Sequence, residues 1–213
     1  MKIAIISDTH CRHHELELPP VDIIFHTGDF TAAERIDQNK METDRFLTWF
    51  TRQKANHKIF IAGNHELYMS YLSKRGESFS YVKENYPELI YLENSSVSID
   101  GKLIYGTPYC PIFGYWAFMK HEFELEKIFK GINKKTQILL THTPAFGTLD
   151  VVEGWRSGSE ALVDQIDKLD DLKYHFFGHI HGSYGMKDGM KYTSVNSSIC
   201  SPRGLNNPVI LDI

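Results

Sequence analysis

KIAIISDTH, residues 2–10, joins a short apolar run to a polar cluster that contains Asp8 and His10. A near-continuous apolar run of this length is typical of a strand that is buried on both faces of a sheet. The same pattern, an apolar run that ends in polar residues, recurs along the chain. The predicted strands are Lys2–Ser7, Val21–His26, Lys58–Ala62, Ile138–Thr141 and Tyr174–Phe177.

Helices and hairpins are predicted between these strands. In Glu42–Lys54, Phe46, Trp49 and Phe50 follow the i, i+3, i+4 spacing of one helix face. Further helices are predicted over Phe79–Asn85, Phe123–Phe129 and Ser159–Leu169, the last with Ser159 as its N-cap. Asp-Gly pairs predict two-residue turns in two hairpins, Val97–Ile99 with Lys102–Tyr105 and Tyr184–Lys187 with Met190–Val195. We therefore expect an α/β fold with a partly parallel core.

Length and composition favour one domain over residues 1–213. The chain is 42% hydrophobic and 23% charged, as in ordinary globular proteins. No apolar run reaches the length of a membrane helix, and we interpret the N-terminus as a strand and not as a signal peptide. Three scattered cysteines favour a reducing, cytoplasmic location over a disulfide framework or a structural zinc site. The net charge of −4 argues against binding to long nucleic acid.

Polar clusters that follow the predicted strands supply groups that bind metal ions. Ligands collect at the carboxyl ends of the strands in open α/β sheets. Carboxylate, imidazole and amide groups without thiolates suit Mn, Fe or Zn. The clusters are Asp8-Thr9-His10, Gly28-Asp29, Gly63-Asn64-His65-Glu66, His142 and Gly178-His179-Ile180-His181. Two metal ions fit this set if one carboxylate bridges them, and Asp29 is the predicted bridge.

Each cluster alone also has a purely structural explanation. Gly28-Asp29 and Gly63-Asn64 could be turns, because Gly, Asp and Asn are turn formers. A single His142 after a strand could simply be hydrogen-bonded near the surface. The combination favours a metal site, because every cluster stands at the end of a predicted strand.

The order D-x-H, G-D, G-N-H-E, H, G-H-x-H resembles the calcineurin-like metallophosphoesterase superfamily, from Asp8 to Asn196. More locally, the chain is similar to the family of metallophosphoesterase-domain-containing proteins. The stretches that carry this similarity are DTHCR at 8–12, HTGDF at 26–30, IAGNHEL at 61–67, GTP at 106–108, WAF at 116–118, LLTHTP at 139–144 and GHIH at 178–181. The resemblance implies a four-layer α/β/β/α sandwich. Departures at Met119, Thr143 and Ala145 leave the substrate open.

The resemblance also implies a ligand set for two divalent metal ions. The first ion would take Asp8, His10, Asp29 and His181, and the second would take Asp29, Asn64, His142 and His179. We expect Mn²⁺, with Fe or Zn as alternatives.

His65 would face the substrate beside Asn64 and Asp29, without being a ligand. It would donate a proton to the leaving oxygen or a hydrogen bond to the developing charge. Glu66 would either fix the tautomer of His65 or cap the helix that begins there. Arg12 would hold a phosphate oxygen, or else lie solvated on its loop.

The function implied by the resemblance is hydrolysis of a phosphoester by a metal-bridging hydroxide. We expect a phosphodiesterase acting on small diesters or cyclic nucleotides, because a metal cluster of about +1 formal charge suits a diester anion. The alternatives are a phosphomonoesterase acting on nucleotides, sugars or phosphoproteins, and a catalytically silent binding scaffold on the same fold. The expected partner is a small phosphoester, with nucleotides among the candidates.

Some residues outside the ligand set also carry expectations. The aromatic segment Pro108–Met119 could stack on a nucleobase or pack over the core, and packing is favoured for Phe113 and Phe118. Asn196 could bond a group that supports a ligand, bond the substrate or simply end its strand, and His26 could brace a ligand aspartate. The histidines interpreted as surface or hydrogen-bonded residues are His13, His14, His57, His121 and His175.

Overall fold

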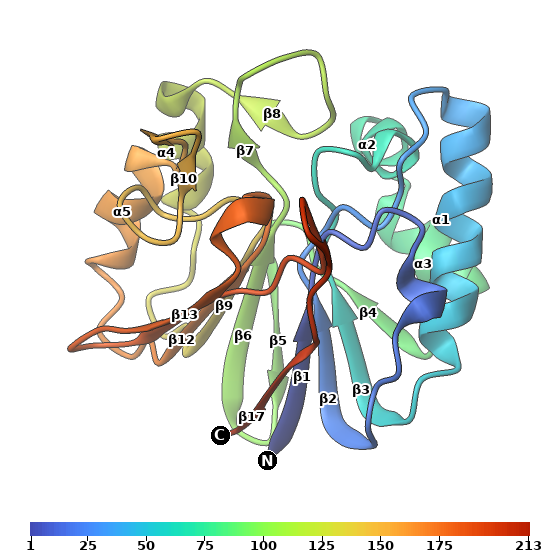
Figure 1. Ribbon diagram of the computed structural model, residues 1–213, viewed down its shortest axis with the longest axis horizontal. Coiled ribbons are helices and arrows are strands. Elements are labelled where there is room, and N and C mark those ends of the chain that lie inside the picture. The colour runs from blue at the N-terminus through green and yellow to red at the C-terminus, as the bar shows by residue number, and fades with distance from the viewer.

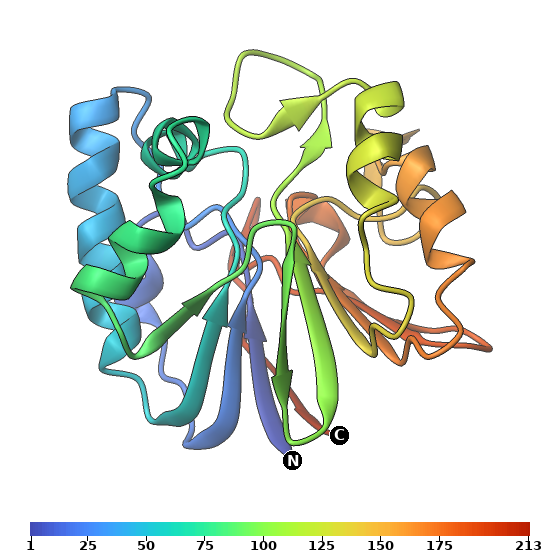
Figure 2. The same ribbon diagram turned by 180° about the vertical axis from the view of Figure 1, so that it is seen from behind.

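The computed structural model describes residues 1–213 and contains two β-sheets packed face to face, with helices on the outer side of each (Figure 1, Figure 2). In the first sheet the order is β17-β1-β2-β3-β4, and only β17 is antiparallel to its neighbour. Its strands are β1 (Lys2–Ile6), β2 (Val21–His26), β3 (Ala55–Phe60), β4 (Leu89–Tyr91) and β17 (Val209–Asp212).

The second sheet has the order β13-β14-β12-β9-β6-β5, with parallel central strands and an antiparallel strand at each edge. Its strands are β5 (Ser95–Ile99), β6 (Lys102–Thr107), β9 (Ile138–Thr141), β12 (Tyr174–Phe177), β13 (Gly185–Asp188) and β14 (Thr193–Asn196).

The apolar strands form this arrangement because both of their faces are covered. In β1, Ile3 and Ile5 lie in the core between the two sheets, whereas Ala4 and Ile6 lie in the core under the helices. All four side chains are fully buried. The alternation of side chains along a strand sends neighbouring residues to opposite faces. A run without polar positions is therefore what an inner strand of this fold requires.

Helices close both outer faces and complete the four-layer α/β/β/α sandwich that the family resemblance implies. Phe46 and Phe50 of the first helix pack on the first sheet, and Phe129 and Leu162 belong to the core on the second. On the first sheet lie α1 (Ile36–Thr51), α2 (Leu67–Lys74) and α3 (Ser78–Asn85); on the second lie α4 (Glu122–Phe129) and α5 (Glu160–Ile166) (Figure 1). The N-cap prediction for α5 is confirmed, because the Ser159 side chain accepts a hydrogen bond from the backbone N–H of Leu162.

Several predicted boundaries differ from the structure, and three of the differences have a clear physical reason. The third strand is Ala55–Phe60, and it starts earlier because pairing with β2 extends it into polar residues. The first helix begins at Ile36, not at Glu42, because its first turns are fixed by the buried amide of Asn39 and not by apolar side chains. In the second hairpin Asp188 pairs with Thr193, so its loop has four residues where a two-residue turn is predicted.

The remaining short elements lie in the connections between the sheets and helices. They are η1 (His13–Glu15), β7 (Cys110–Pro111), β8 (Met119–Lys120), β10 (Val151–Val152), β11 (Trp155–Arg156), η2 (His181–Ser183), β15 (Cys200–Ser201) and β16 (Gly204–Leu205). The three cysteines are free thiols. None of the helices has the length and apolar character needed to span a bilayer.

Candidate metal centre

The predicted ligands of both sheets meet at the carboxyl ends of the central strands. The first sheet supplies Asp8 and His10 after β1, Asp29 after β2 and Asn64 after β3. The second sheet supplies His142 after β9, followed by His179 and His181 after β12. The backbone turns sharply at these points, with positive φ at Asp8, His10, Asp29 and His179. Non-glycine residues in this region are uncommon, and they cluster at functional sites.

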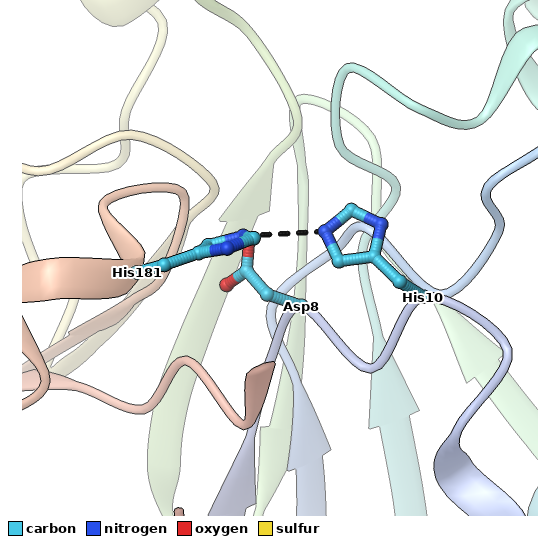
Figure 3. A group of neighbouring side chains, drawn as sticks. All are labelled: Asp8, His10 and His181. Carbon is cyan, nitrogen blue, oxygen red and sulfur yellow. Dashed lines mark hydrogen bonds and ion pairs between the residues drawn. The ribbon is translucent and has the colours of Figure 1, made fainter. Parts of the chain in front are cut away.

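One group of ligands joins the two sheets directly. The Nε2 atom of His181 lies 3.3 Å from Oδ1 of Asp8 and 3.2 Å from Nε2 of His10 (Figure 3). The three residues offer one ligand atom each within 4.8 Å of one another. This arrangement could hold a metal ion between residues that are 171 positions apart in the sequence.

Asp29 lies at the middle of the cluster. Its Oδ2 atom is 3.3 Å from Nε2 of His142 and 4.0 Å from Nε2 of both His10 and His65. Its other oxygen accepts a hydrogen bond from the backbone N–H of His65. One carboxylate oxygen therefore faces imidazoles from both predicted metal positions, as a bridging ligand would.

The hydrogen bonds of the imidazoles test whether the site suits a cation. Nδ1 of His142 lies 2.9 Å from the carbonyl oxygen of Thr27, which can only accept, so Nδ1 carries a proton. Nε2 of His142 then faces two acceptor oxygens, with Oδ1 of Asn64 at 2.9 Å and Oδ2 of Asp29 at 3.3 Å. Because Nδ1 already carries the proton of a neutral imidazole, Nε2 can face these two oxygens favourably only if a second proton or a metal ion lies between them. His10 is oriented in the same way, with Nδ1 bonded to the carbonyl of Thr31.

The charges of the cluster fit the same conclusion. Burial alone would raise the pKa of Asp29, but the neighbouring His142 lowers it well below its ordinary value. Burial opposes protonation of His142, yet Asp29 raises its pKa to about 9. Burial lowers the pKa of His179 to about 3 and also lowers that of His65. Without a metal ion, the proton on His142 supplies the positive charge beside Asp29. A bound ion would replace that proton, because metal ions bind ionised carboxylates and neutral imidazoles.

Glu66 is a buried carboxylate that fixes the loops carrying the ligands. Its oxygens accept hydrogen bonds from the backbone N–H groups of Gly63 at 2.6 Å, Asp29 at 2.7 Å and Thr31 at 2.9 Å. It makes no side-chain cap bond at α2 and no hydrogen bond to the ring of His65. Both roles expected for Glu66 are therefore wrong, and the residue instead ties the loops after β2 and β3 together.

A second hydrogen-bonded network supports Asp8. The hydroxyl of Ser198 donates to Oδ2 of Asp8, and the side chain of Asn196 accepts from the backbone N–H of Ser198. The amide of Asn196 also donates to the carbonyl of Ile180, between the two histidines that follow β12. Asn196 therefore supports predicted ligands from both sheets, which is one of the roles expected of it.

Glycines occupy two positions where a side chain would displace a ligand. A Cβ atom on Gly63 would collide with the carboxylate of Asp29, and one on Gly178 would collide with that of Asp8. The backbone N–H of His179, which follows Gly178, donates to both oxygens of Asp8 at 3.0 and 2.9 Å. These glycines allow the backbone of one strand end to approach the carboxylate of another.

His65 faces a cavity of about 430 Å³ that opens over the ligands. Its ring lies 4.7 Å from that of His10 and 4.4 Å from that of Trp116. His65, His10 and Asp29 also satisfy the spacing of a metal-binding group. The geometry therefore allows His65 either the predicted role toward the substrate or that of a further ligand.

The aromatic segment divides into a buried part and an exposed part. Phe118 is 5% exposed and packs in the helix-side core, as predicted. Phe113 is 61% exposed and its ring lies 5.2 Å from that of His179, so the prediction that it packs over the core is wrong. The segment β7–β8 therefore forms part of the wall of the site.

Several other predicted residues lie outside the ligand cluster. The guanidinium of Arg12 binds Glu15 at 2.7 Å on the surface and does not line the cavity over the ligands. His26 contacts the hydroxyl of Thr9 and accepts from the backbone N–H of Gly28, so it braces no aspartate. His175 is buried against the hydroxyl of Thr141, as expected of a hydrogen-bonded histidine.

Sequence reasoning missed the hairpin β10–β11, whose Val151, Val152 and Glu153 line the cavity. Its strands have only two residues each and are exposed, so they lack the apolar pattern of a strand. Sequence reasoning also missed Arg203, which lines a neighbouring cavity together with His181. Arg203 stands in a polar loop that carries no motif.

Comparison with known proteins gives consistent matches. The family described as calcineurin-like phosphoesterase matches residues 1–183. Metallophosphoesterase domain-containing protein 1 of Homo sapiens is 32% identical over 235 residues, covering 100% of this chain and 71% of that protein. UPF0046 protein K07C11.7 of Caenorhabditis elegans is 30% identical, covering 94% of this chain and 70% of its own.

Solved structures share the fold at low sequence identity. TT1561 of Thermus thermophilus aligns with a TM-score of 0.60 at 14% identity, covering 92% of this chain and 88% of that one. A dimetal phosphatase from Danio rerio aligns with a TM-score of 0.54 at 12% identity, covering 92% and 86%. At these identities the likeness extends to the fold alone.

Proposed function

Because the chain belongs to the calcineurin-like phosphoesterase family and is a metal-dependent phosphoester hydrolase, we propose that it hydrolyses small phosphodiesters at a centre of two divalent metal ions. Asp8, His10, Asp29 and His181 would hold the first ion. The second would be held by Asp29, Asn64, His142 and His179. The position of the Asp29 Oδ2 atom, which faces imidazoles of both groups, carries this proposal.

The proposed metal is Mn²⁺, with Fe or Zn as alternatives. All donors in the set are imidazole nitrogens or carboxylate and amide oxygens, which these ions accept. When bound, the two ions supply positive charge for the phosphoryl oxygens and a water molecule of lowered pKa.

The side chains around the ions have separate tasks in this proposal. Burial lowers the pKa of His65, so its imidazole is neutral at pH 7 and can donate one hydrogen bond toward the leaving oxygen. The ring of Trp116 lies tilted against that of His65, with 4.4 Å between the ring centroids. Glu66 and Ser198 hold the two aspartates in position through the hydrogen bonds described above. Arg12 would reach a phosphate oxygen only after leaving its ion pair with Glu15.

The charge of the cavity favours a diester over a monoester. The cavity over the ligands contains no Lys or Arg, and Glu153 adds a carboxylate to its wall. A phosphodiester carries one negative charge, whereas a monoester carries up to two and requires more compensation. The alternative, a phosphomonoesterase, is supported by Arg203, because the cavity that Arg203 lines also includes His181.

A comparison of two chromogenic substrates tests the proposal. The protein would be stripped of metal, titrated with Mn²⁺ and assayed on bis-p-nitrophenyl phosphate and p-nitrophenyl phosphate. Mn²⁺-dependent turnover that favours the diester is the expected result. A preference for the monoester would support the phosphomonoesterase instead, and no turnover of either with two ions bound would contradict both.

A further inference from the structure

A second cavity, of about 520 Å³, adjoins the predicted metal centre. It lies between the loop Pro111–Phe113 and the hairpin β10–β11, which stand at the same end of the molecule (Figure 1). It shares Phe113, Val152 and His179 with the cavity over the ligands. A molecule bound at the metal centre can therefore extend into it.

The walls of this second cavity are apolar surfaces left open to solvent. Ile112 is 48% exposed, Val152 is 43% exposed and Phe113 is 61% exposed. Small-molecule sites combine such apolar walls with a few polar groups. Here the polar groups are Arg156, Ser157 and the backbone at Gly158. Exposed apolar walls beside a charged centre indicate that part of a ligand covers them.

The hairpin wall is held in place without a ligand. The fully buried carboxylate of Asp150 accepts hydrogen bonds from the backbone N–H of Gly147 at 2.9 Å and of Gly158 at 3.3 Å. It also binds the guanidinium of Arg156 at 2.8 Å. A wall fixed in this way requires little ordering when a ligand binds.

The position of the second cavity indicates which part of a diester it receives. Its lining includes His179 but not His65, the predicted donor to the leaving oxygen. The leaving arm is therefore expected on the side of His65 and Trp116, and the remaining arm on the side of Phe113.

We propose that the second cavity binds the non-leaving ester arm of the substrate and that this arm carries an aromatic ring. The exposed ring of Phe113 provides a flat apolar face for it, with Val152 on the other wall. This inference rests on the proposed phosphodiesterase function and adds the chemical class of one arm.

Diesters that share one leaving group test the proposal. The Mn²⁺-loaded protein would be assayed on p-nitrophenyl phosphodiesters whose other arm is methyl, phenyl or thymidine 5′. We expect kcat/KM to be about tenfold higher for phenyl than for methyl, because the ring covers apolar wall. A thymidine arm better than phenyl would identify a heteroaromatic base as the natural occupant, and a worse one would identify a simple aryl group.

Variants of the loop between β7 and β8 test whether the preference for a phenyl arm arises in the second cavity. Phe113→Ala should reduce the phenyl-to-methyl ratio to within about twofold of unity, and Phe113→Tyr should retain it. Tyr115→Ala is the matched control, because Tyr115 is fully exposed on the same loop and does not line the second cavity. Equal kcat/KM for all arms, or an unchanged ratio in Phe113→Ala, would overturn the proposal.

A binding measurement separates this inference from the proposed function. Calorimetric titration with phenyl phosphate and methyl phosphate should show about tenfold tighter binding of the phenyl compound, and Phe113→Ala should abolish the difference. If no diester is hydrolysed while this difference persists, the phosphodiesterase function is wrong and the cavity assignment stands. If diesters are hydrolysed but neither rate nor binding depends on the arm, only the cavity assignment is wrong.

Discussion

Asp29 is the single residue that both predicted metal positions share, so its charge should control both. Replacement by Asn keeps an acceptor for the N–H of His65 and tolerates the positive φ of 59° at this position. The variant loses only the negative charge between the imidazoles. We expect Asp29→Asn to lose both metal ions and the hydrolytic activity.

Metal content per chain, measured by atomic emission after Mn²⁺ loading and desalting, checks this expectation. Glu153→Gln provides the control, because it makes the same change of charge at an exposed position of the same cavity. Two ions retained by Asp29→Asn would show that this residue does not bridge.

His65 tests the separation between metal binding and stabilisation of the leaving oxygen. If it donates a hydrogen bond to the leaving oxygen, His65→Ala should keep both ions and lower kcat by roughly 10²–10³-fold. The loss should be larger for alkyl than for p-nitrophenolate leaving groups, because the charge on a good leaving group is delocalised and gains less from a hydrogen bond. Rates on both substrate types, with metal content measured in parallel, check the prediction.

Two results would contradict this assignment of His65. A full rate in His65→Ala would exclude a contribution of this hydrogen bond to the reaction. A loss of metal ions would make His65 a ligand, as its spacing to His10 and Asp29 also allows.

At the scale of elements, the loops that follow the strands need hydrogen-bond partners for their backbone. Glu66 is the main such partner for the loops after β2 and β3. Three backbone N–H groups converge on its carboxylate. Glu66→Gln would turn an amide N–H₂ toward at least one of these donors. We expect it to lower the free energy of unfolding by about 2–4 kcal/mol, since buried donors lose their acceptor.

Urea denaturation of Glu66→Gln and of Glu88→Gln tests whether Glu66 stabilises the loops after β2 and β3. Glu88 is exposed on the loop before β4, so its substitution should leave the free energy of unfolding within about 0.5 kcal/mol of wild type. Equal stability of the two variants would contradict the role of Glu66.

The sequence predicts well the elements that bury apolar side chains. β2, β9 and β12 have the predicted bounds because their side chains are almost all buried, and those of β2 and β9 enter two apolar cores. Elements that are fixed by buried polar side chains are either not predicted or predicted with the wrong bounds. Asn39 starts α1 and Asp150 holds β10–β11, and both act through hydrogen bonds to backbone groups that no periodic pattern reveals.

The same distinction applies to the candidate site. That its predicted ligands come together could be predicted, because each stands directly after an apolar strand. The role of Glu66 could not, because the three N–H groups that it binds come from separate loops. The exposure of Phe113 depends on the path of its loop over the edge of the second sheet, where local sequence specifies little.

At the scale of the whole molecule, the site exists only while the two sheets keep their spacing. Asp29 and Asn64 follow strands of one sheet, whereas His142 follows a strand of the other. Their contacts of 2.9 and 3.3 Å therefore span the interface between the sheets. Gly106 of β6 sets part of that spacing, because a Cβ there would lie 2.7 Å from a methyl group of Ile61.

Gly106→Ala should consequently affect stability and metal binding together. Overpacking should lower the free energy of unfolding by about 1–3 kcal/mol. The shift of one sheet against the other should also weaken Mn²⁺ binding, although Gly106 is not a predicted ligand. Gly182→Ala is the control for unfolding, because a Cβ there meets no atom within 4 Å. Urea denaturation and calorimetric Mn²⁺ titration measure both effects, and a destabilised variant with unchanged Mn²⁺ affinity would show that the site tolerates movement of the sheets.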